Sequence, residues 1–501
     1  MEINSLDDLD KLELKIRQKI SKFRLGDVLY SLYQIKYSLK PFIVAGVALF
    51  AIRFSKPSIV SQNFKLLNIQ PIIELVSNYL LADPITFDQE LKNNFMGSNP
   101  DFSMVRVVYS QFPFEVSEFS QFSRPILLYH EIPNSLVGKA GIPNFDIHKE
   151  FLILNGVSIH EFINIGFAAS AFAKNNFAFS LKLFAQVCSQ GISLLDDKAI
   201  SQVLHQLAGD RVKITTLYDE LKNTDRRFRM YDFNPLRTYP LVFPCKSKGF
   251  GNFGQEFMCA PVPGLIDDRM SIGIYYQLFN NFKNTFSNYF GYVLEEYLKL
   301  ILNNSINSEK FIDIRDLGIK ESKSPDYAII DGSVAIFLEC KAIKFKLPAQ
   351  TISSEEAIKD SLKQVIKGLI QIDTFIKDRA SNLDEFHECS TFMPVLVTFE
   401  EMYLINSDDF RDYINNELLK KNKEFVNLDW QILSIGELER LQPHLAAGIH
   451  LSQVLQDLKH KSFNSVLKEL ASQTRKTFKD SFLYPKQKEL YQRLGLPDRS
   501  E

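Results

Sequence analysis

Residues 324–342 read SPDYAIIDGSVAIFLECKA, and this stretch decides the fold of the part of the chain around it. Residues 327–330 and 334–338 are two apolar runs with β-branched and aromatic side chains, which favour strands. Asp331-Gly332 stands between them and is a typical two-residue hairpin turn. The stretch therefore predicts a β-hairpin of two antiparallel strands.

Charged residues stand at one end of this predicted hairpin. Asp326 precedes the first strand, and Glu339 and Lys341 close the second. Because successive side chains of a strand point to opposite faces, Glu339 and Lys341 share a face and Cys340 points to the other. The hairpin brings Asp326 next to them, so we expect two carboxylates and an amine to meet at one edge of a sheet.

Such a group is suited to metal-assisted hydrolysis of a phosphate ester. Magnesium takes oxygen ligands and usually keeps several waters, and Asp326, Glu339 and the backbone carbonyl of Cys340 could supply three protein oxygens. A bound metal lowers the pKa of a coordinated water and offsets negative charge on phosphorus. Lys341 could orient that water or stabilise the developing charge.

The simpler interpretation is a surface ion pair at a strand end, because an acid followed two residues later by a lysine occurs elsewhere in the chain. A second Pro-Asp pair ends at Asp101 and is followed by Glu115, but Ser117 occupies the place of the lysine. Only residues 325–341 combine the Pro-Asp pair, the turn, the apolar strand and the lysine. Burial of a charged pair is also costly without a partner or a metal, so we favour the catalytic interpretation.

Residues 325–326 (PD) and 339–341 (ECK), with twelve residues between them, resemble the signature of the PD-(D/E)xK nuclease superfamily. The spacing resembles that of archaeal Holliday-junction resolvases in particular. The resemblance covers residues 284–400 and extends at most to residue 437. It implies a restriction-endonuclease-like core, with Mg²⁺ as cofactor and Mn²⁺ as an alternative ion.

The resemblance also implies residues on the two flanking helices. A glutamate in a G-x3-E setting precedes the first strand in this family, and Gly291 and Glu295 fit that form, with Glu296 as the alternative. Glu295 would then help to bind the metal or to orient the water. Some members add a glutamine on the helix after the second strand, for which Gln364 is the first candidate and Gln371 the second.

The residues around the hairpin predict an α/β core with a mixed sheet. In chain order, the predicted elements are a helix at 284–303, strands at 311–317, 327–330 and 334–338, a helix at 354–376, a strand at 394–399, a helix at 410–419 and a strand at 430–435. Ser353 and Glu356 fit a capping box at the start of the second helix. An apolar residue stands at every third or fourth position from Ile358 to Ile376, which predicts the buried face of that helix.

The rest of the chain predicts helices with a few strands, so the fold class is α+β with several domains. Residues 16–39 and 147–172 show helical spacing, and residues 104–109 and 125–129 favour strands. We expect three parts: a mainly helical recognition or regulatory region at 1–275, the nuclease-like domain at 281–437 and a helical C-terminal tail at 438–501.

Composition limits the partners and the compartment. The chain has 501 residues and a formal net charge of -2, so contacts with nucleic acid must come from a local basic patch. The five cysteines form no C-x-x-C pair, which disfavours a zinc site and suits a reducing cytoplasm. The acidic N-terminus does not resemble a signal peptide, and the apolar run at 41–52 is too short for a membrane span. We expect a cytoplasmic protein without a membrane partner.

These observations favour a Mg²⁺-dependent endonuclease that acts on DNA, in bacterial anti-phage defence or restriction. A homodimer would allow such an enzyme to cut two strands, and residues 1–275 could recognise a protein partner or a phage-derived trigger. One alternative is a catalytically inactive nuclease-like module that binds nucleic acid or protein. Another is an interaction protein whose helical N-terminal half carries the function.

Overall fold

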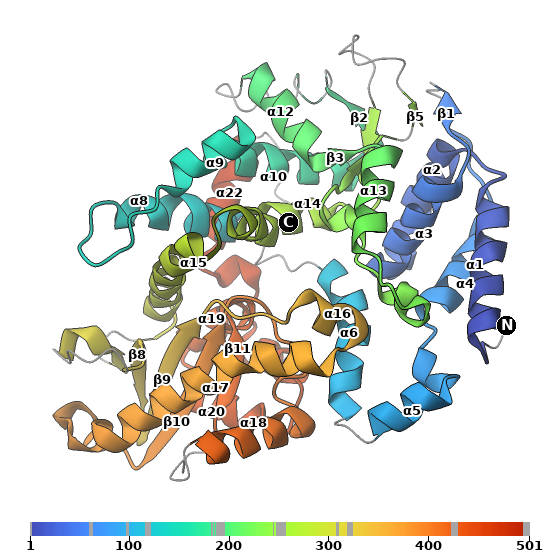
Figure 1. The fold of residues 1–501 in the computed structure, drawn as a ribbon. Helices are drawn as coiled ribbons and strands as arrows, with labels where there is room; N and C mark the ends of the chain where they lie inside the picture. The colour runs from blue at the N-terminus through green and yellow to red at the C-terminus, as the bar shows by residue number, and fades with distance from the viewer. Residues whose placement is uncertain are drawn as a thin grey trace.

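The computed structural model describes residues 3–59, 64–96, 100–115, 122–181, 184, 186, 196–243, 245–246, 257–306, 310–317, 324–421 and 429–493. Helices make up most of these residues (Figure 1). Strands form a five-stranded and a four-stranded sheet, both mixed, and a short parallel pair. This confirms the expected α+β class with a mainly helical N-terminal region.

The N-terminal helices, coloured blue in Figure 1, contribute most of a second hydrophobic core, which buried residues from positions 214–265 complete. They are α1 (Leu6–Ile20), α2 (Leu25–Ile35), α3 (Pro41–Phe54), α4 (Gln70–Leu80) and α5 (Gln89–Met96). The helix predicted at 16–39 is thus two helices, because Arg24 forms a β-bridge with Lys56 between them. The apolar run at 41–52 lies in α3, whose Val44, Val47 and Ile52 are buried.

A second group of helices follows and connects the N-terminal helices to the large sheet. It comprises α6 (Pro100–Gln111), α7 (Ser123–Ile126), α8 (Ile132–Leu136), α9 (Ile147–Asn155), α10 (Ile159–Asn175), α12 (Asp197–Leu207), α13 (Arg211–Leu221) and α14 (Gly264–Met270). The four-stranded sheet beside them has the order β2 (Ala178–Ser180), β6 (Phe257–Cys259), β4 (Leu241–Val242), β3 (Ala208–Gly209). Gly156, with φ 66°, ends α9, so the helix predicted at 147–172 is also two helices.

Two strand predictions in this region are wrong. Residues 104–109 lie in α6, and residues 125–129 lie in α7 and the π-helical turn that follows it. In α6 the buried side chains Phe102, Val105 and Tyr109 fall on one helical face. A short apolar run does not distinguish a buried helix from a buried strand. In both segments, packing against the surrounding helices favours the helix.

The large sheet has the strand order β11-β10-β9-β8-β7. Its strands are β7 (Phe311–Asp313), β8 (Tyr327–Asp331), β9 (Val334–Lys341), β10 (Thr391–Thr398) and β11 (Gln431–Ser434). β7, β8 and β9 pair antiparallel, whereas β9, β10 and β11 pair parallel, so the sheet is mixed as expected. The carboxyl ends of the three parallel strands consequently meet at one edge.

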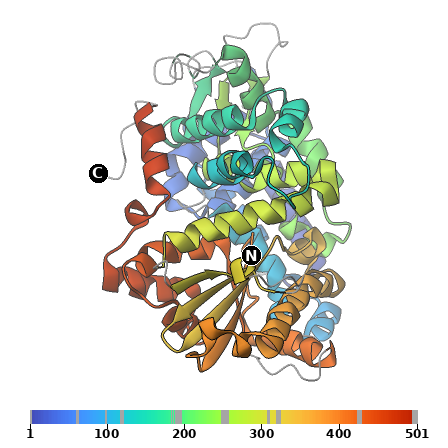
Figure 2. The ribbon, with the colours of Figure 1, turned by 90° about the vertical axis from the view of Figure 1, so that its left-hand side faces the viewer.

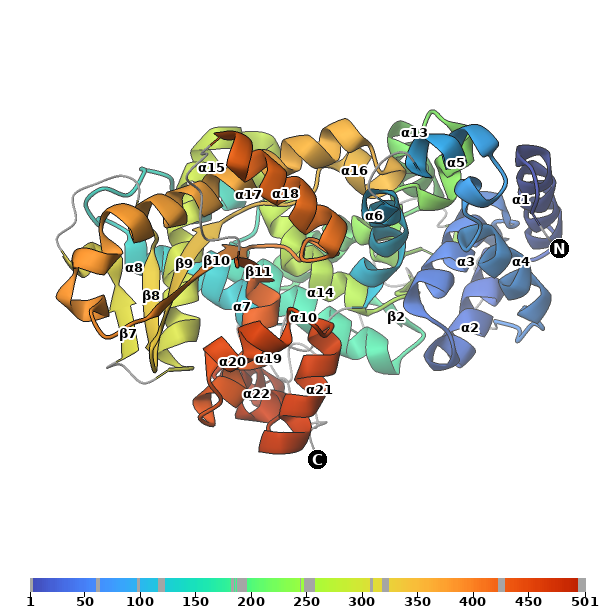
Figure 3. The same cartoon turned by 90° about the horizontal axis from the view of Figure 1, so that it is seen from below.

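Helices cover both faces of this sheet. In Figure 2, α15 (Ile272–Asn303) runs between the sheet and the N-terminal helices above it, and its buried side chains join those of Tyr327, Leu338 and Val395. α17 (Glu355–Asp378) covers the opposite face, where Phe337 and Phe375 are in contact. α16 (Leu347–Ile352) and α18 (Asp408–Lys421) lie on the same side as α17 (Figure 3).

The hairpin forms at the predicted place but turns one residue later than expected. Asp331 pairs with Val334 as the last rung of the ladder, so Gly332 and Ser333 make the turn, with Gly332 at φ 65°. Only glycine adopts that conformation without strain. In the resulting register Tyr327 faces Leu338.

The start of α17 also differs from the predicted capping box. Ser354 is the N-cap, and its hydroxyl accepts a hydrogen bond of 3.3 Å from the amide of Ala357. Ser353 instead ends α16 with φ 51°, and its hydroxyl donates to the carbonyl of Ser103 in α6. The buried face from Ile358 to Ile376 is as predicted.

The predicted boundary at 275–281 falls inside α15. This helix changes direction at Lys283, whose φ of 47° and ψ of -124° are not helical, so its second segment begins where the predicted helix at 284–303 begins. α19 (Ile435–Ala446), α20 (Leu451–Asp457), α21 (Phe463–Thr474) and α22 (Tyr484–Arg493) form the C-terminal part. One hydrophobic core, here called the shared core, contains side chains of α10, α15, the sheet and these C-terminal helices.

Candidate active site

The hairpin register brings Asp326 beside the end of β9. The amide of Asp326 donates to the carbonyl of Leu338 over 3.0 Å, which extends the ladder by one residue beyond β8. The amide of Cys340 then donates to Oδ2 of Asp326 over 2.7 Å. The structure therefore holds the Asp326 carboxylate against the backbone between Glu339 and Lys341, where the sequence places it.

Glu339 and Lys341 share the α17 face of β9. Their side chains form an ion pair, and Glu339 is only 1% exposed, whereas the Lys341 side chain is 31% exposed. The Oε2 atom of Glu339 is buried and has no hydrogen-bond partner within the described residues. The lysine is thus reachable from solvent, and one glutamate oxygen is left without a donor.

Gly368 allows α17 to approach this part of the sheet. A Cβ at this position would lie 2.6 Å from Cδ1 of Leu396 and 3.9 Å from Cγ of Glu339. The buried Leu396 side chain would have to shift to admit a side chain there, so the glycine allows α17 to lie this close to the strands.

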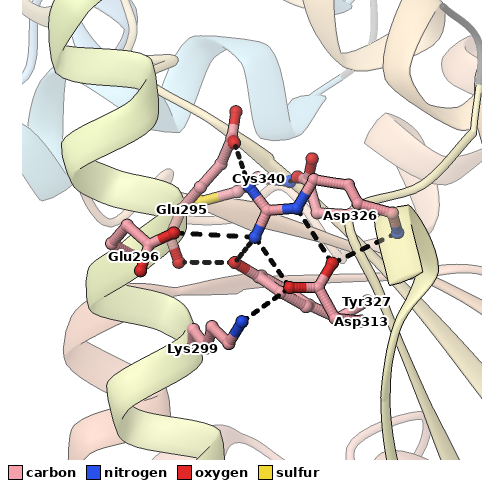
Figure 4. A network of polar contacts seen from close by, with 8 residues as sticks. Glu295, Glu296, Lys299, Asp313, Asp326, Tyr327 and Cys340 are labelled. Carbon is pink, nitrogen blue, oxygen red and sulfur yellow. Dashed lines mark hydrogen bonds and ion pairs between the residues drawn. The ribbon is translucent and has the colours of Figure 1, made fainter. Parts of the chain in front are cut away.

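Glu295 and Glu296 in α15 reach the same region from the other side of the strand ends (Figure 4). Nη1 of Arg315 lies 3.6 Å from Glu295, and its Nη2 lies 3.6 Å from Glu296. Asp313 fixes this arginine through hydrogen bonds of 2.9 Å and 2.8 Å. Glu295, the first candidate of the two, interacts electrostatically with both Asp326 and Lys341.

The acidic groups strongly perturb one another. Burial, followed by repulsion from Asp326, raises the pKa of Glu295 to about 8 and that of Glu339 to about 8. Burial also raises the pKa of Asp326 to about 6, although the Cys340 amide opposes the shift. Burial acts to lower the pKa of Lys341, but Glu339 outweighs it, and the net shift is upward. The three carboxylates therefore ionise less readily together than each would alone, and an additional positive charge would favour their ionised forms.

The donor set fits a hard divalent cation. Within the described part of the chain, no three His, Cys, Asp or Glu side chains already surround a common point as metal ligands. Magnesium, however, is commonly held by one or two carboxylates, with water and substrate phosphate as further ligands. Asp326 and Glu339 supply the two carboxylates. The carbonyl of Cys340 points to the same side of β9 as its amide, towards Asp326. The unpartnered Oε2 of Glu339 is a free ligand atom.

The two glutamine candidates differ in their surroundings. Gln364 is exposed on α17, one turn before Gly368. Gln371 is half-buried, and its Nε2 donates over 2.8 Å to the carbonyl of Ser324, directly before the Pro-Asp pair. Gln371 therefore supports the segment that leads into Asp326, whereas Gln364 points to solvent beside the site.

The second Pro-Asp pair is not part of a comparable group. Asp101 lies in the first turn of α6, and its amide donates to Asp409 over 2.9 Å. Glu115 forms an ion pair of 3.8 Å with Lys40, and Ser117 lies outside the described residues. The placement of Asp101 and Glu115 agrees with their rejection as catalytic candidates.

Arg315 is a charged residue at this site that the sequence analysis did not reveal. It lies in the short 3-10 turn after β7 and reaches the glutamates only because Asp313 holds it there. The one signal in the sequence is the Asp-x-Arg spacing at the end of a strand, which is too common to select it. Its guanidinium also lies 5.6 Å from the ring centre of Tyr327, so β8 positions it as well.

No single described helix is both long and apolar enough to cross a membrane, although α9 and α10, bent by 61°, satisfy the two criteria together. Comparisons of the chain with protein-family models, with curated proteins and with solved structures found no match.

Proposed function

We propose that the chain is a metal-dependent nuclease that hydrolyses phosphodiester bonds in DNA. The observation that carries the proposal is the convergence of Asp326, Glu339 and Lys341 at one edge of a mixed sheet, with Asp326 hydrogen-bonded to the Cys340 amide. A helix on each face of that sheet, with Glu295 on the first, is the arrangement that the PD-(D/E)xK resemblance implies. We assign residues 281–437 to a restriction-endonuclease-like core on these grounds.

Each residue has a separate role in this proposal. Asp326, Glu339 and the Cys340 carbonyl would hold Mg²⁺ or Mn²⁺, which supplies Lewis-acid activation of water and charge neutralisation at phosphorus. Lys341, protonated and partly exposed, positions the water or the phosphate. Glu295 adds a third carboxylate that can accept a proton, and Gln364 offers an exposed amide beside the site.

For the biological setting we propose bacterial anti-phage defence or restriction. The helices of residues 1–275 pack against the nuclease-like part and are suited to recognise a protein partner or a phage-derived trigger, as in anti-phage or restriction proteins. A homodimer would place two such sites on a duplex. A cytoplasmic location agrees with the composition and the free cysteines.

Purified protein incubated with plasmid, linear duplex and single-stranded DNA, in Mg²⁺, Mn²⁺ or EDTA, tests the proposal. We expect metal-dependent cleavage that Asp326→Asn and Lys341→Met each abolish. Asp384 and Lys420 are exposed and belong to none of the groups described above, so Asp384→Asn and Lys420→Met are matched controls that should cut normally. Cleavage that survives both active-site substitutions would refute the assignment.

One observation favours a catalytically inactive nucleic-acid-binding module as the second candidate. Glu339 is buried and already paired with Lys341, which would compete with a metal for the carboxylate. This candidate predicts DNA binding with no cleavage in either metal, and binding that does not change in EDTA.

A further inference from the structure

A cavity of about 470 Å³ lies at the same edge of the sheet as the candidate active site but contains none of its residues. Phe399, Glu400 and Glu401 line it directly after β10, and Gly436 and Glu437 line it directly after β11. Ligands of α/β proteins commonly bind beyond the carboxyl ends of parallel strands, and the volume lies in the usual range for small-molecule sites of roughly 300–1,000 Å³.

The other wall of the cavity comes from the N-terminal half of the chain. Tyr109, Arg124, Arg237, Asp268 and Ser271 contribute to it. Ser271 is only 3% exposed, and its buried hydroxyl has no hydrogen-bond partner within the described residues. A buried hydroxyl without a partner costs free energy unless something in the cavity binds it.

The basic side chains that line the cavity are already neutralised by acidic ones. Two of these pairs are Arg237 with Asp268, at 3.6 Å, and Arg440 with Glu401. The remaining pairs are Lys40 with Glu115 and Arg124 with Glu439. An anionic ligand would therefore find no uncompensated positive charge.

Two acidic side chains, in contrast, form no ion pair within the described residues. Glu400 is 8% exposed and accepts a hydrogen bond of 2.8 Å from the Tyr276 hydroxyl. The Glu437 carboxylate accepts a hydrogen bond of 2.7 Å from the amide of Ser434, and the two residues form the capping box of α19. Burial raises the pKa of Glu400, and burial together with Glu401 raises that of Glu437 to about 7. Lys344 and Arg237 act electrostatically on Glu400, and Arg440 acts on Glu437, but none of them forms an ion pair with either carboxylate within the described residues. The cavity thus holds two poorly solvated carboxylates that can accept a further cationic partner.

Aromatic side chains line the same cavity as these carboxylates. The rings of Tyr109 and Phe112 lie 5.1 Å and 5.2 Å from that of Tyr403, all three lining the cavity. Carboxylates combined with aromatic faces favour organic cations over hydrated metal ions, because the rings attract positive charge and offer apolar contact.

We propose that this cavity binds a small organic cation that carries an ammonium or guanidinium group, with Glu400 and Glu437 as its anionic partners and Ser271 as an additional acceptor. The site joins the N-terminal half to the strand ends. Lys344, three residues after Lys341, has its amine 3.4 Å from the ring centre of Tyr276, which binds Glu400. A cation bound at Glu400 would therefore change the charge near Lys344, which is close to the candidate active site in the chain.

Thermal unfolding of the full chain at pH 8 and constant ionic strength, with agmatine and with spermidine as probes, tests the proposal. We expect Tm to rise with millimolar probe in a saturable way, and the rise to shrink at pH 6, where Glu437 is protonated. Glu437→Gln and Glu400→Gln should each reduce the apparent affinity at least tenfold. Glutamine retains the capping box and the hydrogen bond to Tyr276, so both variants should fold.

Glu385→Gln is the matched control, since Glu385 is exposed before the start of β10, at the opposite edge of the sheet. It should leave the Tm shift unchanged. Absence of a saturable shift with either probe would overturn the proposal, as would equal shifts in the wild type and both glutamate variants. A shift with AMP but not with the cations would also overturn it, because the arginines would then be the binding groups. None of these readouts depends on nuclease activity.

Discussion

Oδ2 of Asp326 accepts a hydrogen bond of 2.7 Å from the amide of Cys340, the residue between Glu339 and Lys341. Since this bond needs an acceptor and not a charge, Asp326→Asn should retain the fold. We expect its free energy of unfolding to remain within about 1 kcal/mol of the wild type, the net value of one such bond. Activity should fall at least 100-fold, measured as initial cleavage rate in Mg²⁺.

Asp326→Ala separates the two contributions, because alanine removes the acceptor as well as the charge. It should lower the free energy of unfolding by about 1–3 kcal/mol, since it leaves the Cys340 amide unpaired. Equal stability of the two variants in urea titrations would show that the hydrogen bond contributes nothing.

The stability of the metal-free protein should fall as pH rises between about 5 and 8. Burial raises the folded-state pKa values of Glu295 and Glu339 to about 8 and that of Asp326 to about 6, above those of the unfolded chain. The folded state therefore binds more protons than the unfolded state in this range, and the slope of unfolding free energy against pH is negative. Urea titrations in EDTA at several pH values measure it.

Magnesium should reverse that trend, because it binds the ionised carboxylates and thereby stabilises the folded state most at high pH. The Glu339→Gln variant, which loses one titrating group, should show a shallower slope in EDTA and a smaller response to Mg²⁺. A Mg²⁺ effect of the same size at pH 5 and pH 8 would contradict a carboxylate metal site.

Gly368→Ala should destabilise the protein by about 1–3 kcal/mol, the usual cost of overpacking. The added Cβ would lie 2.6 Å from Cδ1 of Leu396, whose side chain is fully buried and would have to shift. In an exposed helical position the same exchange stabilises by up to about 1 kcal/mol, so the sign of the effect is diagnostic. Lys367→Ala, at the exposed neighbouring position, is the control, and chemical unfolding is the measurement.

Arg315→Ala should raise the pKa of Glu295 further, because the guanidinium favours the ionised carboxylate. The affinity for Mg²⁺ at pH 7 should fall several-fold, and the pH at which cleavage activity is half-maximal should rise. Calorimetric titration with Mg²⁺ at pH 7 and pH 9 measures both effects. Arg315→Lys should recover part of the affinity, whereas Lys420→Ala, on the exposed end of α18, should change nothing. An unchanged pH profile in Arg315→Ala would contradict this role.

The part of the fold that the sequence predicts well is the part with strong local patterns. The hairpin follows from two apolar runs around one glycine, and α17 follows from its spacing between Ile358 and Ile376. The group of Asp326, Glu339 and Lys341 follows in turn, because strand alternation and antiparallel pairing are short-range geometry.

Other features depend on distant contacts and could not be read locally. Residues 104–109 and 125–129 are apolar runs of five or six residues whose state depends on what surrounds them. Arg315 reaches the site because a turn after β7 folds back to α15. The hairpin turns at Gly332 and Ser333 because Asp331 pairs with Val334. The cavity lies between segments far apart in the chain, so no motif marks it.

The shared core has a consequence for any attempt to isolate the proposed catalytic part. Side chains of α10, α15, the strands and α22 belong to this one core. A fragment excised at residue 281 would keep the part of α15 that covers the sheet but lose α10 and the other helices that pack against α15, so the apolar side chains between them would face water and the fragment is expected to aggregate. Tolerance to insertion or truncation should therefore be sought at the outer helices, not at the junction that the sequence suggests.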